Sequence, residues 1–217
     1  MIAVERGPES APDIGRDRLL AFSDAIFAFA ITLLALDVRL PDLPAGVTDA
    51  QLGDALAQLV PKIFAYAVTF AVVGLFWLAH WRRFQFIAHV DEPLLLVNLV
   101  LLGFVALLPF PTAVLGAHGD LPTATVLYVA NLSAVGLLGT ASWFVAYRRG
   151  LVRPDVTRSD ALLGLLRGVP VPIVMLGSLA LLRFGTSVVE LSWLLIFPVQ
   201  SLIRRLVRRR AEAPSGP

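Results

Sequence analysis

The sequence predicts an all-α integral membrane protein with six transmembrane helices. Hydrophobic residues make up 57% of the 217 residues and charged residues only 16%, against about 25% charged in ordinary globular domains. The mean hydropathy is +0.78. Six apolar segments of about 20 residues follow one another, and a helix of that length crosses a hydrocarbon core about 30 Å thick. These segments leave no room for a separate soluble domain.

The first apolar segment runs from about Arg18 to Val38, where charged residues and prolines end it. A polar loop is expected over residues 46–54. The remaining segments cover about residues 59–79, 93–115, 124–147, 162–182 and 186–207. Pro109 and Pro111 are expected to break or end the third segment, because proline lacks the N–H that continues a helix.

The six segments form one transmembrane domain over residues 18–210. Residues 1–17 are mixed polar with two prolines, which indicates a short lead before the first helix. Residues 211–217 are small and polar, which predicts a disordered tail.

The distribution of basic residues predicts the orientation in the membrane. With six spans, both termini lie on one side. Of the 18 Lys and Arg residues, fourteen lie on that side, Arg39, Lys62 and Arg183 lie on the other, and Arg167 lies within a span. Because short cytoplasmic loops carry an excess of Lys and Arg, both termini are expected to be cytoplasmic. The protein is expected to be a multi-pass protein of the cell membrane.

From Leu19 to Leu36 the only charged residue is Asp24, and the only other polar groups are the hydroxyls of Ser23 and Thr32. A carboxylate inside a membrane helix costs roughly 2.5–3.5 kcal/mol on insertion scales. Arg18 is six residues away, about 240° around the helix, and cannot pair with Asp24 within it. Each therefore needs a partner on another helix.

Large apolar residues form a stripe along the first helix. At 100° per residue, they fall within about 40° of Phe22, and they are Ile26, Phe29, Leu33, Leu36 and Leu40. Asp24 lies about 200° from Phe22 and so does not share this face. The stripe alone is equally typical of a surface that contacts lipid or the protein core.

The stretch also carries a motif. Arg18, Phe22, Ser23 and Asp24 form the pattern R-x-x-x-F-S-D at the start of the first apolar segment. This pattern resembles the opening of the first helix in the TMEM175 family of potassium channels. The resemblance covers about residues 15–115 by motif and the rest by hydropathy pattern. It implies a homotetramer of six-helix channel units that conducts cations passively through a central pore.

The resemblance also implies which residues narrow the pore. In the family the first helix lines the pore, and large aliphatic residues on it form the constriction. The corresponding positions are Phe29, Leu33 and Leu36, and the phenyl ring of Phe29 departs from the family pattern. Either Phe29 or Leu36 is the narrowest point. Thr32 is a candidate pore hydroxyl, or its hydroxyl bonds back to the Ala28 carbonyl, as Thr commonly does in apolar helices.

Three residues on the second and third helices complete the resemblance. Trp77, His80 and Asn98 correspond to family positions thought to hold the Ser-Asp pair by hydrogen bonds. The residues alone favour the same arrangement, because His80 and Asn98 lie at the depth of Ser23 and Asp24, where unpaired polar groups are costly. An interfacial His80 with no partner is the alternative.

Enzymatic chemistry has little support in the sequence. His80, His89 and His118 lie in separate contexts without a metal-binding spacing, and the chain has no cysteine and no Gly-rich phosphate loop after a strand. We therefore expect no enzyme activity, no cofactor, no bound metal beyond transient potassium, and no nucleic-acid partner. The selectivity filter T-V-G-Y-G of ordinary potassium channels is also absent.

The resulting hypothesis is a potassium-permeable channel that lies in the lipid bilayer. Other monovalent cations and protons are further candidates for the permeating ion. The alternative is a proton-coupled or solute transporter that uses Asp24, Arg167 and Glu190 as relay groups. Transporters usually contain an internal repeat with broken helices at matching positions. Here the kinks expected at Pro170, Pro172 and Pro198 fall in the last two spans, and no clear repeat relates the two halves of the chain. A structural membrane subunit without transport is a third reading.

Overall fold

A computed structural model describes residues 14–36, 38–157, 160–161, 164–165, 168–199 and 201–202. The helices are α1 (Ile14–Leu36), α2 (Asp49–Gln58), α3 (Val60–Phe86), α4 (Glu92–Leu107), α5 (Pro109–His118), α6 (Pro122–Arg148), α8 (Pro170–Ser178), η1 (Leu179–Phe184), α9 (Thr186–Ser192) and η2 (Trp193–Leu195). Within these residues the only β feature is an isolated bridge between Ile87 and Val152. The expected all-α class is confirmed.

Four helical stretches are long and apolar enough to cross a membrane by length and composition: Gly15–Leu36, Val60–Phe86, Glu92–His118 and Pro122–Arg148. They match the first four expected spans. Two shorter apolar helices follow, Pro170–Phe184 and Thr186–Val199. Parts of the last two expected spans, including Arg167, lie outside the described residues. Six spans therefore stay a prediction.

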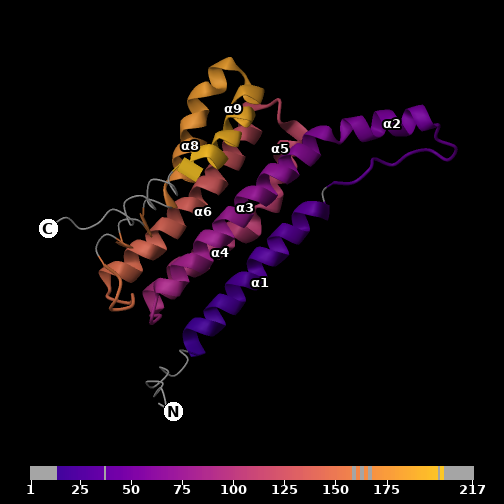
Figure 1. Cartoon of the computed structure of the whole chain (residues 1–217). Helices are drawn as coiled ribbons and strands as arrows, with labels where there is room; N and C mark the ends of the chain where they lie inside the picture. The colour runs from indigo at the N-terminus through magenta and orange to yellow at the C-terminus, as the bar shows by residue number, and fades with distance from the viewer. Residues whose placement is uncertain are drawn as a thin grey trace, which may run out of the picture.

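The long helices lie side by side, with α1 at one edge and α8 and α9 at the opposite edge (Figure 1). α1 packs against α3, α4 and α5, while α6 packs against α4, α5 and α8. α6 has the largest set of buried residues, including Tyr128, Leu132, Val135 and Trp143. α6 is therefore the central helix, and α1 is a peripheral one.

The third membrane stretch is interrupted where the sequence predicts. α4 ends at Leu107, Leu108 caps it, and α5 begins at Pro109. The Leu108 N–H donates to the Val105 carbonyl at 3.2 Å. This carbonyl is three residues back instead of the four of an α-helix, so the chain forms a 3₁₀ turn here. The pyrrolidine at Pro109 removes the next donor, and the segment continues as α5 after the break.

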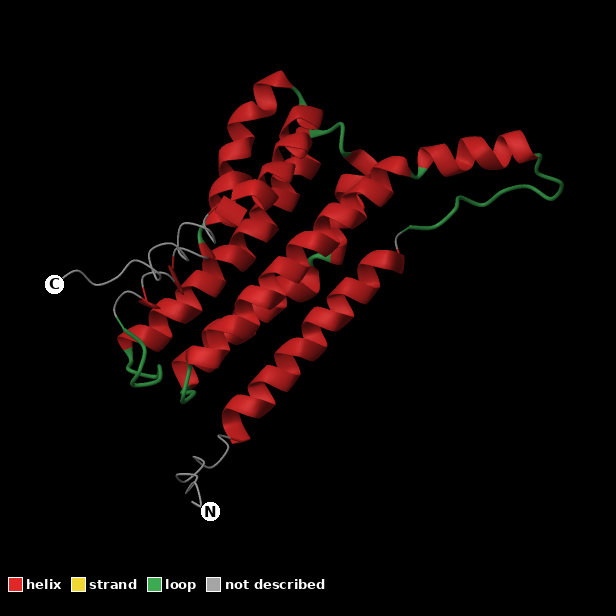
Figure 2. Ribbon diagram, in the orientation of Figure 1, coloured by secondary structure: helices red, strands yellow, loops and turns green. Residues whose placement is uncertain are grey.

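The loop expected over residues 46–54 is wrong in part, because α2 begins at Asp49. Thr48 caps this helix: its hydroxyl accepts from the Gln51 N–H at 3.3 Å, and the Gln51 side chain accepts from the Thr48 N–H at 2.9 Å. This reciprocal pair is a capping box. The T-x-x-Q spacing was present in the sequence and is the signal that marks the helix start. α2 projects from the bundle as an arm (Figure 2).

The contact between α6 and α8 leaves no room for a side chain at Gly136. A Cβ placed there would lie 2.5 Å from Cγ and 2.8 Å from Cδ of Pro172. Because the proline ring is rigid, Gly136→Ala is expected to force α8 away and lower stability by about 1–3 kcal/mol. Thermal unfolding in detergent measures the loss. Gly103→Ala on α4 is the control, since nothing lies within 4 Å of its added Cβ. Equal melting temperatures for the two variants would contradict the close packing.

The connections at the end of the bundle near the start of α1 are held by polar contacts. Asp91 caps α4 by accepting from the Leu94 N–H at 3.1 Å and forms an ion pair with Arg149. The Arg149 guanidinium holds the pKa of the Asp91 carboxyl below its usual range. The contribution of this pair to stability is therefore present at neutral pH and is lost as the pH falls through that lowered pKa.

Candidate functional site

α1 has one buried face and one exposed face. The buried residues are spaced three or four apart, as one helix face requires, and they are Leu19, Ser23, Phe27, Ala30 and Leu34. On the other side the apolar stripe is bare: Phe22 is 51% exposed, Phe29 64% and Leu36 52%. Leu33 lies half-buried between the two faces. Ile26 of the stripe is also half-buried and packs against the core. A single copy of the chain thus covers one side of α1 and leaves Phe22, Phe29 and Leu36 of the stripe exposed.

A buried hydrogen-bond chain ties the first third of α1 to α4 and α3. Ser23 Oγ donates to the Leu19 carbonyl at 2.8 Å, and Asn98 Nδ2 donates to Ser23 Oγ at 3.1 Å. Asn98 Oδ1 lies 2.8 Å from His80 Nε2. Because Oδ1 can only accept, the proton of a neutral His80 belongs on Nε2. Ser23 and Asn98 are fully buried and His80 is 2% exposed.

The ring of His80 sits between two apolar rings. Its centroid lies 5.6 Å from that of Phe27 on α1 and 4.6 Å from that of Phe84 on α3. His80 Nδ1 is buried and has no hydrogen-bond partner in the described part of the chain. The alternative of an interfacial histidine without a partner is therefore wrong, since one ring nitrogen is bonded and both faces are packed.

Asp24 makes a separate contact to α3. Trp77 Nε1 donates to Asp24 Oδ1 at 2.8 Å, and the carboxylate is half-buried. The neighbouring residues Ser23 and Asp24 therefore reach two different helices. Arg18 lies on the exposed side of α1 and is not brought into either contact.

The hydroxyl of Thr32 donates to the Ala28 carbonyl at 2.6 Å on the exposed side of α1. This is the backbone bond that was one of the two readings of Thr32. A hydroxyl that donates in this way still has lone pairs free to accept or to bind a cation. The observed bond therefore leaves the candidate role open.

The relay groups of the transporter reading are not brought together. Glu190 on α9 is half-buried beside Gly119 and lines a hollow of about 560 Å³ with Asp120. Asp24 lies on α1 against Trp77, and Arg167 is outside the described residues. No group of three potential metal ligands occurs among the residues that the structure covers.

The structure also contains a buried hydroxyl cluster that sequence reasoning missed. Thr69 Oγ1 lies 2.8 Å from the Tyr128 hydroxyl, and Thr112 Oγ1 donates to Thr69 Oγ1 at 3.3 Å. These bonds join α3, α5 and α6. The only sequence signal was a few isolated hydroxyls in apolar helices, which does not say which of them meet.

Removing the contact between Asp24 and Trp77 is expected to destabilise the protein. A hydrogen bond to a charged group contributes about 1.5–3 kcal/mol, so Asp24→Ala and Trp77→Phe should each lower the unfolding free energy by about that amount. The double variant should cost much less than the sum, because both changes remove one bond. Trp81→Phe is the control, since Trp81 is exposed and donates no hydrogen bond to a described residue. Additive losses would mean that the bond contributes little.

Residues 18–109 match the family described as "Endosomal/lysosomal potassium channel TMEM175". A protein of Streptomyces collinus named as a potassium channel is 38% identical over 139 residues, which are 61% of this chain and 65% of that protein. The match thus spans slightly less than two thirds of that relative's length. A chicken protein named "Endosomal/lysosomal proton channel TMEM175" is 31% identical over 139 residues, 61% of this chain and 27% of that protein.

The fold is also similar to that of a solved channel. The crystal structure of a lysosomal potassium-selective channel TMEM175 homolog from Chamaesiphon minutus superposes with a TM-score of 0.69. The two chains are 28% identical, and the alignment covers 89% of this chain and 98% of the other. The similarity therefore extends beyond the matched motif region to most of the chain.

Proposed function

We propose that this chain is a member of the TMEM175 family and a potassium-permeable channel in which four copies surround a pore lined by α1, supported by the family match over residues 18–109 and by the fold similarity to the Chamaesiphon minutus channel. The observation that carries this proposal is the bare apolar stripe of α1, where Phe29 is 64% exposed. The opposite face of the same helix is buried and hydrogen-bonded. A helix held in a fixed rotation, with one side uncovered at the edge of the bundle, is suited to face a shared axis.

In this proposal the constriction consists of Phe29, Leu33 and Leu36. An apolar constriction controls flux by excluding water, and large side chains on four copies would leave a narrow opening. Thr32 lies on the exposed side between them, where its lone pairs can replace part of an ion's hydration shell. Asp24 is directed toward Trp77 and acts as an anchor rather than as an ion site.

We further propose six spans, with both termini in the cytoplasm of a multi-pass protein of the cell membrane. The four long apolar stretches and two shorter apolar helices support this arrangement. The excess of basic residues at the end of the bundle where α1 starts and α6 ends supports the orientation. Residues 1–17 would form the cytoplasmic lead, residues 18–210 the channel domain and residues 211–217 the tail.

A potassium flux assay on purified protein in liposomes tests the function. With a potassium gradient and a flux dye, the channel is expected to let potassium flow down its gradient. This flow should not depend on the transport of a second ion by the same protein. Flux that requires an opposing proton gradient would favour the transporter instead, and no flux would favour a structural subunit. The same vesicles with a proton gradient and a pH dye show whether protons also permeate, as the name of the chicken relative suggests.

The assembly can be tested separately from conduction. Native mass spectrometry in detergent is expected to give a homotetramer. The position of α1 at the edge of a single copy means that one chain does not surround the helix. A protein found only as monomers or dimers would contradict the shared pore.

A further inference from the structure

The arm formed by α2 carries two carboxylates, and neither forms an ion pair with a residue that the structure describes. Asp49 and Asp54 are both exposed, and the helix contains no Lys or Arg. Next to them, Leu56 is 49% exposed, and Val60 and Ile63 just beyond the arm are 60% and 46% exposed. These apolar residues are four and three apart and therefore share one face. α2 joins the bundle at the start of α3 and otherwise projects from it on the side of α1 (Figure 1).

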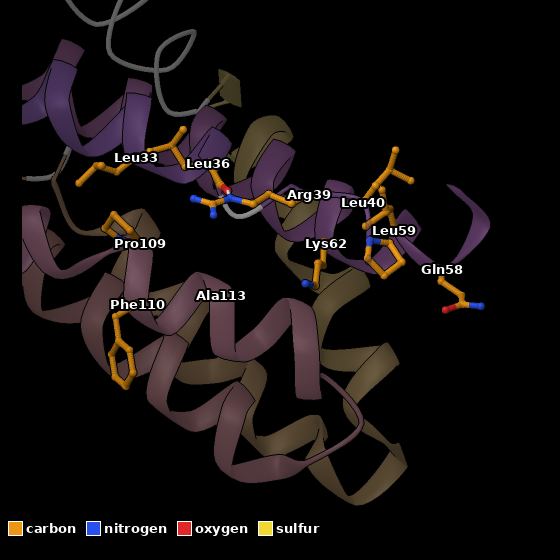
Figure 3. A pocket seen from close by; sticks show the side chains of 11 residues that line it. Leu33, Leu36, Arg39, Leu40, Gln58, Leu59, Lys62, Pro109, Phe110 and Ala113 are labelled. Atoms are coloured by element: carbon orange, nitrogen blue, oxygen red, sulfur yellow. Dashed lines mark hydrogen bonds between the residues drawn. The ribbon is translucent and has the colours of Figure 1, made fainter. Parts of the chain in front are cut away.

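A basic hollow lies at the same end of the bundle. It has a volume of about 730 Å³ and is enclosed by the end of α1, the junction of α2 and α3, and the start of α5. Arg39 and Lys62 line it, together with the apolar residues Leu33, Leu36 and Pro109. Figure 3 shows Leu33 and Leu36 on one side, Pro109 on the other, and Lys62 beside them. Of the described residues, no carboxylate lines this hollow.

We infer that α2 of one copy docks through Asp49 and Asp54 into the Arg39 and Lys62 hollow of the neighbouring copy. The inference rests on the proposed function, which places a neighbouring copy against α1. The charges are complementary, and complementary charges select a partner and fix its register. Arg39 and Lys62 are two of the three basic residues expected on this side of the membrane, so few other sites there could receive an acidic helix.

The composition of α2 favours a protein partner over the lipid surface. Helices that lie in a membrane interface carry Lys and Arg on their polar face, whereas α2 carries two carboxylates and no base. An anionic lipid surface would repel it. The size of the hollow also fits, since about 730 Å³ lies within the usual range for a site that encloses a small group of side chains or a ligand.

Docking would also change the charge at one mouth of the pore. Arg39 lies three residues beyond Leu36, the last residue of α1, and its Nε donates to the Leu36 carbonyl. The guanidinium therefore stands beside the residue that we assign to the constriction. Two bases from each copy at this mouth would repel cations. Carboxylates from the neighbouring arm would neutralise them, so the arms would form a ring that admits potassium.

Cross-linking between differently tagged copies tests this docking. The chain has no cysteine, so introduced thiols react only with each other. Asp54→Cys with one tag and Lys62→Cys with another are co-expressed and then oxidised mildly. A mixed cross-linked dimer carrying both tags is expected. Asp54→Cys paired with Phe184→Cys is the control. Phe184 is exposed at the end of η1, between α8 and α9, and these two helices lie at the edge opposite α1 (Figure 1).

Charge reversal provides a second test. Lys62→Glu is expected to weaken the tetramer about fivefold in a dilution series, the size of effect that one accessible ion pair gives. Adding Asp54→Lys should restore it. Arg183→Glu reverses the third basic residue of this side, away from the hollow, and should leave assembly unchanged.

The outcomes separate the two proposals. Intact tetramers whose mixed cross-linking does not exceed the control would overturn the docking and leave the channel proposal standing. Monomers alone would overturn both. A third outcome is that no mixed cross-links form and that native mass spectra show a bound anionic phospholipid, which Lys62→Glu loses. A lipid headgroup would then occupy the hollow, and the docking would be overturned.

Discussion

Asn98→Ala is expected to lower the unfolding free energy by about 1–3 kcal/mol, because it leaves the buried N–H of His80 without an acceptor. Asn98 lies 2.8 Å from His80 and 3.1 Å from Ser23, and all three residues are buried. The change also removes the hydrogen bond from Asn98 to Ser23. Among the described residues, this is the only buried side-chain hydrogen bond between α1 and α4. Potassium flux should therefore fall together with the melting temperature.

A rescue distinguishes the lost partner from a merely smaller side chain. Replacing both members of a buried polar pair by apolar groups costs less than removing one. His80→Phe places an aromatic ring between Phe27 and Phe84, so its combination with Asn98→Leu should recover much of the stability. Ser142→Ala on α6 is the control for flux: it deletes a buried hydroxyl that bonds to the Leu138 carbonyl of its own helix. If Asn98→Ala melts like the wild type, the network does not hold α1.

Phe29→Ala is expected to raise potassium flux about tenfold, the change that lowering a barrier by about 1.4 kcal/mol produces. Phe29 is the bulkiest and most exposed residue of the proposed constriction, at 64% against 52% for Leu36. Removing four phenyl rings from a shared axis would widen the opening and ease its wetting. Leu36→Ala should raise flux less.

The comparison decides where the pore is narrowest. A larger increase for Leu36→Ala would mean that the Phe29 rings tilt out between helices. Phe144→Ala is the control, because Phe144 is a 50% exposed phenylalanine on α6 rather than α1. Flux unchanged by either α1 substitution, in tetramers shown to be intact, would contradict a pore along the stripe. Liposome flux normalised to reconstituted tetramer is the appropriate measurement.

The features that could be predicted from sequence follow from strong local signals. Uninterrupted apolar runs predicted the first four membrane stretches, and Pro109 predicted the break in the third. The cost of a carboxylate in an apolar helix predicted that Asp24 needs a partner, and Trp77 provides one. The resemblance to the family, together with similar depth in the membrane, pointed to Ser23, His80 and Asn98 as neighbours.

The features that escaped prediction depend on packing between distant segments. Nothing local says that the hydroxyls of Thr69, Thr112 and Tyr128 meet, because each helix alone could turn them elsewhere. The Arg39 and Lys62 hollow is likewise formed by three separate elements. Arg18 was expected to need a partner on another helix, yet it is exposed, and an exposed charged group near the end of a helix can be solvated.

The break at Pro109 has a consequence for how the third membrane stretch keeps its shape. Because the Leu108 N–H bonds to Val105, the Phe104 carbonyl loses its usual partner within the helix. Asn131 Nδ2 on α6 donates to that carbonyl at 3.1 Å. The bend is thus stabilised from a second helix, and replacing Pro109 alone would not straighten the segment. The direction in which α5 leaves α4 therefore depends on α6 as well as on the proline, and a change at Asn131 would act on a helix that Asn131 does not belong to.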